Sequence, residues 1–392
     1  MEPTHDPDPA PAGAGAGAAT NTPPSANAAG AAAWRRTVRA AAIAAAFVAG
    51  YVLLDRVSYI HPVQQFNITP WNPQPALAIA LVMTLGQRWL PVVLAAALLA
   101  ERVVRGDLIS MPASALAAAV LMLGYAAIAR ALTGHFSVSF RLDTRRDILR
   151  LAGVVVVGSL ATGVLYVVAL LATGTGPRSA PVAAVVGFWI GDAIGILVTL
   201  PLLLMLLDPA RRRQLRRLLA GGELLAQCAA IVAVVWGLFG WAAPDQFKYF
   251  YALFLPIVWV AARTGMAGVA VAAVVMQGCV ILAVSFVGYQ TLTVFELQAL
   301  LMALTFTGYF VGVTVDERRR AAEELKRTLG LAVAGEMSAA IAHELNQPLL
   351  AVSAYAKASR LLAEAPANDR ERLVQTLDKL AAEAKRAGDV VR

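Results

Sequence analysis

His343 and Glu344 are the adjacent residues with the clearest capacity for chemistry in this sequence of 392 residues. An imidazole can act as a nucleophile, and a neighbouring carboxylate can hold its protonated nitrogen or accept its proton as the other nitrogen attacks. Taken alone, a surface histidine beside a glutamate is more often part of a solvated helix face. The surrounding elements therefore decide between these two interpretations.

A long helix is expected to carry this pair, because the sequence after about residue 314 becomes rich in Ala, Glu, Lys, Arg and Leu. One apolar stripe at helical spacing is formed by Met337, Ile341, Leu345 and Val352. His343 is two residues from Ile341 and from Leu345, about 200° around the helix, so it projects from the opposite side. Pro348 removes a backbone hydrogen bond and is expected to bend the helix one turn later.

A second helix is predicted after the loop at 364–367, with Asn368 as its N-cap and Glu371 three residues later. Its apolar positions follow a heptad seam: Leu373, Leu377, Leu380, Ala384, Ala387 and Val391. Two striped helices cannot bury both faces as a lone hairpin, so we expect two copies to pair into a four-helix bundle. The alternative is an intramolecular hairpin that leaves apolar surface in water.

The composition before this tail is that of a membrane protein. Hydrophobic residues make up 59% of the chain and charged residues only 15%, and the mean hydropathy is +0.65. Soluble domains average about 45–50% apolar and about 25% charged residues. The net charge of +8 comes from short basic clusters between apolar runs, which indicates membrane topology and excludes a nucleic-acid footprint. The two cysteines lie in apolar runs and predict neither a disulfide framework nor a metal site.

Ten apolar runs are candidate membrane spans. They are 38–54, 75–87, 89–104, 111–131, 149–173, 181–207, 223–243, 249–262, 265–286 and 295–315. The pair 75–87 and 89–104 is short and interrupted by proline, so it could form a re-entrant hairpin, and either eight or ten spans are expected. With the amino terminus inside, the inner loops carry twelve basic residues and the outer loops five. This bias predicts that both termini are cytoplasmic.

The predicted organisation is all-α. It consists of a disordered tail rich in Ala, Pro and Gly (1–37), an integral membrane domain (38–315), a helical linker (316–330) and a dimerising hairpin (331–392).

The run from Gly335 to Leu349, with its core His-Glu-Leu-Asn-Gln-Pro, resembles the phosphoacceptor box of sensor histidine kinases. The resemblance implies that His343 accepts the γ-phosphate of ATP and passes it to an aspartate of a response regulator. It also implies that Glu344 is the acid/base partner and that Gln347, four residues after the histidine, helps dephosphorylate the regulator.

Three membrane segments resemble the first type of membrane-associated sensor domain (MASE). They are Trp71-Asn72-Pro73, which departs from the usual Trp-Pro-Pro, the segment 187–195 running to Pro201, and 255–265. Asp192 lies within an apolar run without a basic partner in sequence, so it should face the bundle interior. Asp192, Trp189 and Trp71 are the candidate sensing residues, while helix packing at Gly191 and Gly195 is the structural alternative for Asp192.

The family's ATP-binding domain, with its Asn-rich helix and Asp-x-Gly-x-Gly loop, has no counterpart in this sequence. The expected ATP and Mg2+ would be bound by that missing domain, and no metal site is expected in the chain. We therefore expect either a fragment or an acceptor served by another protein's catalytic domain. The expected setting is a bacterial cytoplasmic membrane, with a homodimer, a response regulator and the bilayer as partners. A transporter with a helical tail and a scaffold without chemistry are the alternatives.

Overall fold

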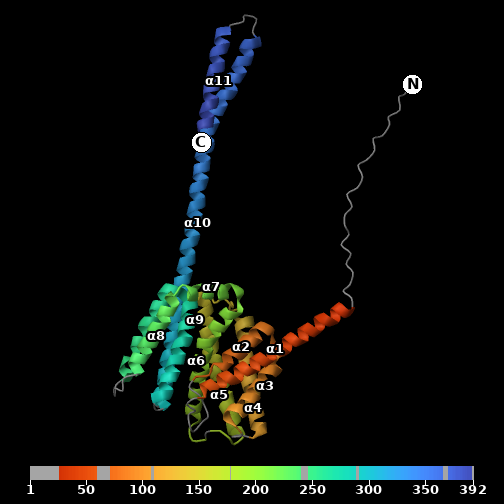
Figure 1. Ribbon diagram of the computed structural model, residues 1–392, viewed down its shortest axis with the longest axis vertical. Coiled ribbons are helices and arrows are strands. Elements are labelled where there is room, and N and C mark those ends of the chain that lie inside the picture. Colours follow the sequence, from red (N-terminus) through yellow and green to blue (C-terminus); the bar gives the residue numbers. More distant parts are fainter. Residues whose placement is uncertain are drawn as a thin grey trace, which may run out of the picture. The chain divides into compact units, whose positions relative to one another are not determined.

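The computed structural model describes residues 26–59, 71–106, 110–176, 178–239, 246–287, 291–364 and 370–390, and every regular element in these ranges is a helix (Figure 1). The α-helices are α1 (Ala26–Ser58), α2 (Gln74–Leu85), α3 (Leu90–Ala100), α4 (Met111–Arg130), α5 (Arg145–Ala172), α6 (Pro181–Leu207), α7 (Pro209–Ala220), α8 (Glu223–Phe239), α9 (Phe254–Val287), α10 (Thr291–Glu364) and α11 (Arg370–Val390). Short 3-10 or π segments are η1 (Gln87–Trp89), η2 (Glu101–Arg105), η3 (Ala131–His135) and η4 (Gln246–Leu253).

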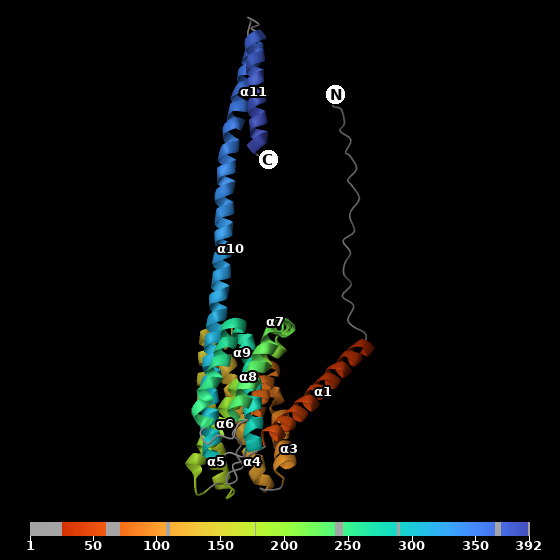
Figure 2. The ribbon, with the colours of Figure 1, turned by 60° about the vertical axis from the view of Figure 1, so that its left-hand side comes forward.

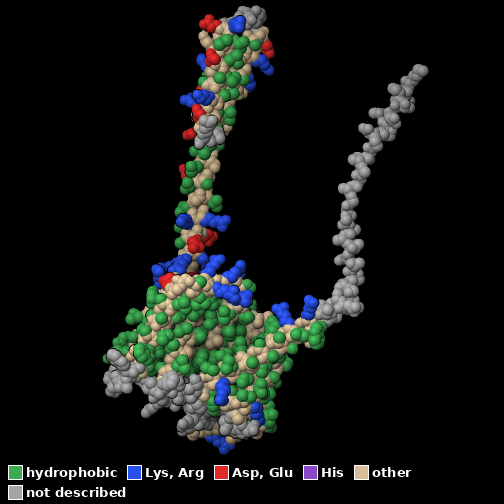
Figure 3. Space-filling model, viewed as in Figure 1, with side chains coloured by type: hydrophobic (Ala, Val, Ile, Leu, Met, Phe, Trp, Pro, Cys, Tyr) green, Lys and Arg blue, Asp and Glu red, His purple; other side chains and the backbone are tan. Residues whose placement is uncertain are grey.

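The prediction of a polytopic membrane helix bundle followed by a helical tail is confirmed. The described residues contain six helices long and apolar enough to cross a membrane, or seven if α7 and α8, bent by 73°, form one span. Of the ten predicted runs, 75–87 and 89–104 correspond to α2 and α3, which have only 12 and 11 residues and are too short to count among these six or seven. Large side chains face outward on these helices, such as Val182, Trp236 and Leu255, each at least 74% exposed, as expected for lipid-facing positions (Figure 3).

The predicted runs 249–262 and 265–286 form one helix with a sharp bend, α9. The bend lies at Gly265, whose φ of 66° is readily available only to glycine. A methyl group added at Gly308 of α10 would lie 3.0 Å from side-chain carbons of both Ile257 and Val269. In a straight helix these two residues would be about 18 Å apart, so the two arms of α9 turn back against one face of α10.

The chain divides into two compact units. Unit 1 contains residues 1–135, 155–200 and 291–298. Within it, α1, α2, α3 and α4 pack against one another, and glycines bring α4 close to α5. A methyl group at Gly124 would lie 2.3 Å from the Thr162 hydroxyl, and one at Gly158 would lie 2.5 Å from Ile128. Glycines that let a neighbouring helix approach closely are how helices associate when lipid replaces water.

Unit 2 contains residues 136–154, 201–290 and 299–392. Here α8 packs along α9, and α7 contacts both helices. α10 extends well past α8 and α9, and α11 folds back beside its far end, as two views show (Figures 1 and 2). The predicted cytoplasmic hairpin therefore corresponds to the end of α10 and to α11, while the proposed cap at Asn368 lies outside the described residues.

Two boundaries differ from the sequence predictions. The tail predicted as disordered to residue 37 is helical from Ala26, because its alanines are the best helix formers and extend the first span backwards. Residues 1–25 lie outside the described part of the chain. The basic loop between α6 and α8 is also a helix, α7, whose start is fixed by Asp208 as N-cap and Pro209 in its first turn.

Candidate functional site

The carboxylate of Asp192 is the centre of a polar network buried in unit 1. Asp192 is 0% exposed, and its Oδ1 accepts a hydrogen bond of 2.9 Å from the Asn72 amide. Its Oδ2 accepts one of 3.0 Å from the Tyr125 hydroxyl. Both donors are neutral, and no salt bridge joins Asp192 to a basic side chain among the described residues. This span therefore keeps a carboxylate whose two oxygens are satisfied without a counter-charge.

The network continues from Asn72 to a second carboxylate. Gln74 donates 2.8 Å to Oδ1 of Asp55, near the end of α1, and makes a longer contact of 3.5 Å with Asn72 Oδ1. Asp55, Asn72 and Gln74 are all less than 8% exposed. The Oε1 atom of Gln74 and the Nε1 atom of Trp71 are buried without a hydrogen-bond partner. One unused acceptor and one unused donor are what a small polar ligand or a water molecule would satisfy here.

Local backbone geometry explains how the segment at residues 71–73 reaches α6. The Asn72 N–H donates to the Gly191 carbonyl at 3.1 Å, which fixes this segment against one turn of α6. A methyl group at Gly195 would lie 1.7 Å from the Asn72 carbonyl oxygen, so only glycine permits this approach. Pro73 and Pro75 then start α2 directly after the contact. Gly191 and Gly195, predicted as a packing spot, and Asp192, predicted as a sensing residue, thus belong to one contact.

The structure brings two of the three candidate sensing residues into this region. Trp71 is 8% exposed beside Asn72, and Asp192 is at the centre of the network. Trp189 is half-buried, and its Nε1 donates 2.8 Å to the Val156 carbonyl of α5, so its hydrogen bond serves helix packing. Tyr125, Gln74 and Asp55 were missed, although a tyrosine hydroxyl inside an apolar run was a usable signal.

The third predicted membrane segment, 255–265, lies within unit 2. This region contacts the turn of α10 that follows the predicted span 295–315. Oδ2 of Asp316 accepts 3.0 Å from the Met266 N–H, the start of the second arm of α9. Arg319 donates 3.1 and 3.0 Å to the carbonyls of Ala262 and Arg263, the end of the first arm. An acidic group at a helix start and a basic group at a helix end both complement the helix dipole. α10 thus caps both arms of α9.

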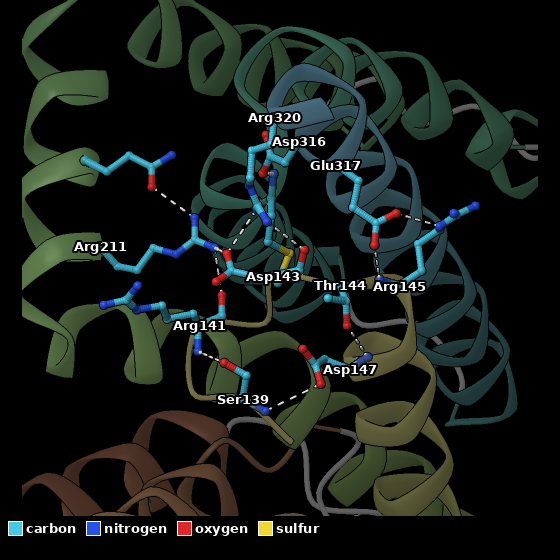
Figure 4. A network of polar contacts seen from close by, with 12 residues as sticks. Ser139, Arg141, Asp143, Thr144, Arg145, Asp147, Arg211, Asp316, Glu317 and Arg320 are labelled. Atoms are coloured by element: carbon cyan, nitrogen blue, oxygen red, sulfur yellow. Dashed lines mark hydrogen bonds and ion pairs between the residues drawn. The ribbon is translucent and has the colours of Figure 1, made fainter. Parts of the chain in front are cut away.

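A charged network surrounds the same part of α10 (Figure 4). Asp143 accepts hydrogen bonds from Arg211 of α7 and, at 3.0 Å, from Arg320 of α10. Arg145 donates to Glu317 of α10 through both its backbone N–H, at 2.9 Å, and its Nε, at 2.7 Å. A polar cavity of about 480 Å³ is lined by Arg141, Asp143, Arg211, Asp316, Arg319 and Arg320. Asp143 is therefore a direct link between α7 and α10.

The predicted phosphoacceptor lies on the exposed part of α10. His343 and Glu344 are exposed, and the Gln347 amide nitrogen lies 3.4 Å from His343 Nε2, one turn later on the same face. Pro348 is buried and lies within the unbroken helix α10. An imidazole open to solvent beside a carboxylate and an amide is accessible to a phosphoryl donor.

The apolar residues of the hairpin are only partly covered within one chain. Three residues of α11 that are spaced seven apart are half-buried or buried: Leu373, Leu380 and Ala387. Other large apolar side chains remain 44% to 71% exposed: Met337, Ile341, Leu349, Leu350, Leu361, Val374 and Leu377. The hairpin therefore leaves a substantial apolar face in water.

Comparisons with known proteins agree with the membrane part of these assignments. The MASE1 family model matches residues 38–319, well over half of the chain. The chain is 40% identical over 93 residues to the sensor protein FixL of Bradyrhizobium diazoefficiens, covering 22% of this chain and 18% of FixL. It is 44% identical over 70 residues to the C4-dicarboxylate transport sensor protein DctS of Rhodobacter capsulatus, covering 18% of this chain and 11% of DctS. Each similarity spans less than a fifth of the relative, and no solved structure matches.

Proposed function

The chain belongs to the MASE1 family, and from this premise we propose that it is the sensory and phosphoacceptor part of a membrane histidine kinase in a two-component system. The observation that carries the proposal is the exposed His343, with Gln347 at 3.4 Å, on the helix that continues from the last span. The short similarities to the sensor proteins FixL and DctS support it.

The proposed reaction needs few groups from this chain. A nitrogen of His343 attacks the γ-phosphorus of ATP, the bond from that phosphorus to the bridging oxygen of ADP breaks, and the imidazole proton passes to Glu344. The phosphoryl group then moves to an aspartate of a response regulator, and Gln347 positions the water that later hydrolyses the aspartyl phosphate. The nucleotide and its Mg2+ are bound by an ATP-binding domain of the histidine kinase family.

The sensory part of the proposal rests on the Asp192 network. Its unused polar atoms, Gln74 Oε1 and Trp71 Nε1, are buried beside Asn72 and offer both a donor and an acceptor to a stimulus. α10 begins in unit 1 and continues to the phosphoacceptor, so it is the covalent route for a signal. The excess of basic residues in the predicted inner loops supports placing both termini in the cytoplasm.

A second copy of the chain is the proposed partner of the hairpin. Residues such as Leu350 and Leu361 are 71% and 63% exposed in one chain, and pairing into a four-helix bundle would cover them.

The test is phosphorylation of the full chain in lipid nanodiscs. Radiolabelled ATP is supplied, and an ATP-binding domain of the histidine kinase family is fused after Arg392. We expect acid-labile label in the parent and none in His343→Ala. His135→Ala, at the end of η3, is the matched control and should label normally. Label on the His343→Ala variant would contradict the assignment of the acceptor. We expect Gln347→Ala to label normally but to slow dephosphorylation of the regulator.

A further inference from the structure

Helix α7 has two different faces. Arg211 and Leu215, one turn apart, are 8% and 5% exposed and form the face turned toward the protein. Four arginines are exposed on the remaining surface: Arg212, Arg213, Arg216 and Arg217. In the described part of the chain, no ion pair joins these four to an acidic side chain. Figure 3 shows basic side chains gathered where Figure 1 labels α7, at the end of the bundle from which α10 emerges.

The connections of α7 and its bend relative to α8 are those expected of a helix that lies at a membrane surface. α6 and α8 are apolar helices, and α7 joins their ends in a connection closed by Asp208 at one side and by Gly221 and Gly222 at the other. The axis of α7 is bent by 73° from that of the apolar helix α8, so the two helices do not continue as one straight helix. Leu219, 38% exposed at the end of α7, lies beside the arginines. A short helix with exposed arginines and a peripheral leucine is suited to the headgroup layer.

We propose that the exposed arginine face of α7 binds anionic lipid headgroups, and that Asp143 transmits the position of α7 to α10. Topology alone needs basic residues in this connection, but it does not need them on one face of a capped helix. Each basic residue near an anionic surface strengthens its attachment, and four together form a polybasic patch. The inference concerns the membrane domain and does not depend on kinase activity.

The contacts of Arg211 supply the route from α7 to α10. Arg211 donates to the Gln214 side chain at 3.0 Å, to the Arg141 carbonyl at 2.9 Å, and to Asp143. Asp143 also accepts from Arg320 of α10, through both its carboxylate at 3.0 Å and its carbonyl at 3.1 Å. The polar cavity between these side chains leaves room for α7 to shift. A shift of α7 on attachment to lipid therefore displaces Asp143, which also contacts α10.

The first experiment reports on lipid binding. Cys228 and Cys279 are replaced by Ser, Leu219→Cys is introduced, and this cysteine carries an environment-sensitive fluorophore in full-length protein in nanodiscs. Discs of phosphatidylcholine are compared with discs that also contain phosphatidylglycerol. We expect phosphatidylglycerol to shift the emission to the blue, and high salt to reverse the shift in the same protein because salt screens the attraction.

Charge-matched variants test the assignment to α7. Changing Arg212, Arg213, Arg216 and Arg217 to Gln should abolish the shift. Changing four basic residues on the hairpin and its linker to Gln removes the same charge and should leave the shift unchanged: Lys326, Arg327, Lys357 and Arg370. An emission independent of phosphatidylglycerol in the parent, or an equal loss in both variants, would overturn the proposal. So would the same shift caused by soluble glycerol phosphate in phosphatidylcholine discs, since the ligand would then be a free phosphate.

A second label tests the link to α10. Leu325→Cys, 60% exposed on α10, is labelled in the same cysteine-free background. We expect its emission to respond to phosphatidylglycerol in the parent and to lose that response in Asp143→Asn, while the Leu219→Cys label still responds. An undiminished response of the α10 label in Asp143→Asn would overturn the role of Asp143.

Discussion

Asp192 and Asp143 are both carboxylates that accept hydrogen bonds from two other segments, but their partners differ in charge. Asp192 is fully buried in unit 1 and accepts from the neutral Asn72 and Tyr125. Asp143 in unit 2 has a side chain 31% exposed and accepts from Arg211 and Arg320.

This difference follows the surroundings of each network. In an apolar span, the attraction within an ion pair must offset the desolvation free energy of two charges, whereas the desolvation free energy of neutral donors is smaller. At a solvated edge, arginines remain hydrated and can exchange partners, so the contact is sensitive to salt and to nearby charge. The network around Asp192 is therefore suited to holding one geometry, and the network around Asp143 to being shifted.

The largest effect should come from adding one methyl group at Gly195. Gly195→Ala places a carbon 1.7 Å from the Asn72 carbonyl, and the segment at 71–73 must move away from α6. We expect a destabilisation above about 3 kcal/mol, since backbone cannot yield as a side chain does. The measurement is thermal unfolding in nanodiscs. Gly335→Ala on α10, with no atom within 4 Å of the new methyl, should instead stabilise its helix by about 0.5–1 kcal/mol. Equal effects of the two variants would contradict the packing argument.

Removal of the Tyr125 hydroxyl should have a smaller effect. Tyr125→Phe leaves Asp192 Oδ2 without its donor inside the protein, which costs about 1–3 kcal/mol. Because the donor is neutral and the site buried, the loss should be the same at low and high salt. Unfolding at two salt concentrations checks this, with Tyr355→Phe on α10 as control. A loss that vanishes in high salt would show that Asp192 depends on charged partners.

Asp143→Asn should show the opposite salt response. It removes the counter-charge of Arg211, whose side chain is 9% exposed, and should cost about 1–2 kcal/mol. This is less than for a fully buried pair, because solvent screens the exposed part of Asp143. The loss should shrink as salt is added. Asp378→Asn on α11 removes an equal charge and should change the free energy of unfolding little. A loss of stability in Asp143→Asn that does not depend on salt would contradict the charged character of this network.

The smallest effect concerns Asp208, the N-cap of α7. The backbone N–H of Ala210 donates to its carboxylate at 2.9 Å and lowers the pKa of Asp208, with Arg141 acting in the same direction. A lowered pKa means that its stabilising contribution is complete above the ordinary value of about 4 and is lost as the pH falls through the folded value. Asp208→Asn retains a capping oxygen that does not titrate. The stability difference between parent and variant should therefore narrow on acidification, as unfolding measured from neutral to acidic pH would show.

The membrane bundle could be predicted largely from hydropathy, because a span must be apolar over its whole length. The structure differs from the predicted runs at particular elements: α2 and α3 are short, and the two runs separated at Arg263 and Thr264 form one helix, α9, which bends at Gly265. α7 was missed because its arginines were interpreted as a topology signal alone, although Asp208 and Pro209 form a helix start.

The sequence by itself determined that this protein is a membrane protein with a helical tail, and it singled out Asp192 and His343, because hydropathy, helical spacing and a rare intramembrane carboxylate are local properties. Only the tertiary structure decided the partners. Asn72 and Tyr125, 120 and 67 residues from Asp192 along the chain, meet its two oxygens, and Asp143 lies between α7 and α10. Pairing over such distances depends on which glycines permit close helix approach, and that is a property of packed surfaces rather than of any single segment.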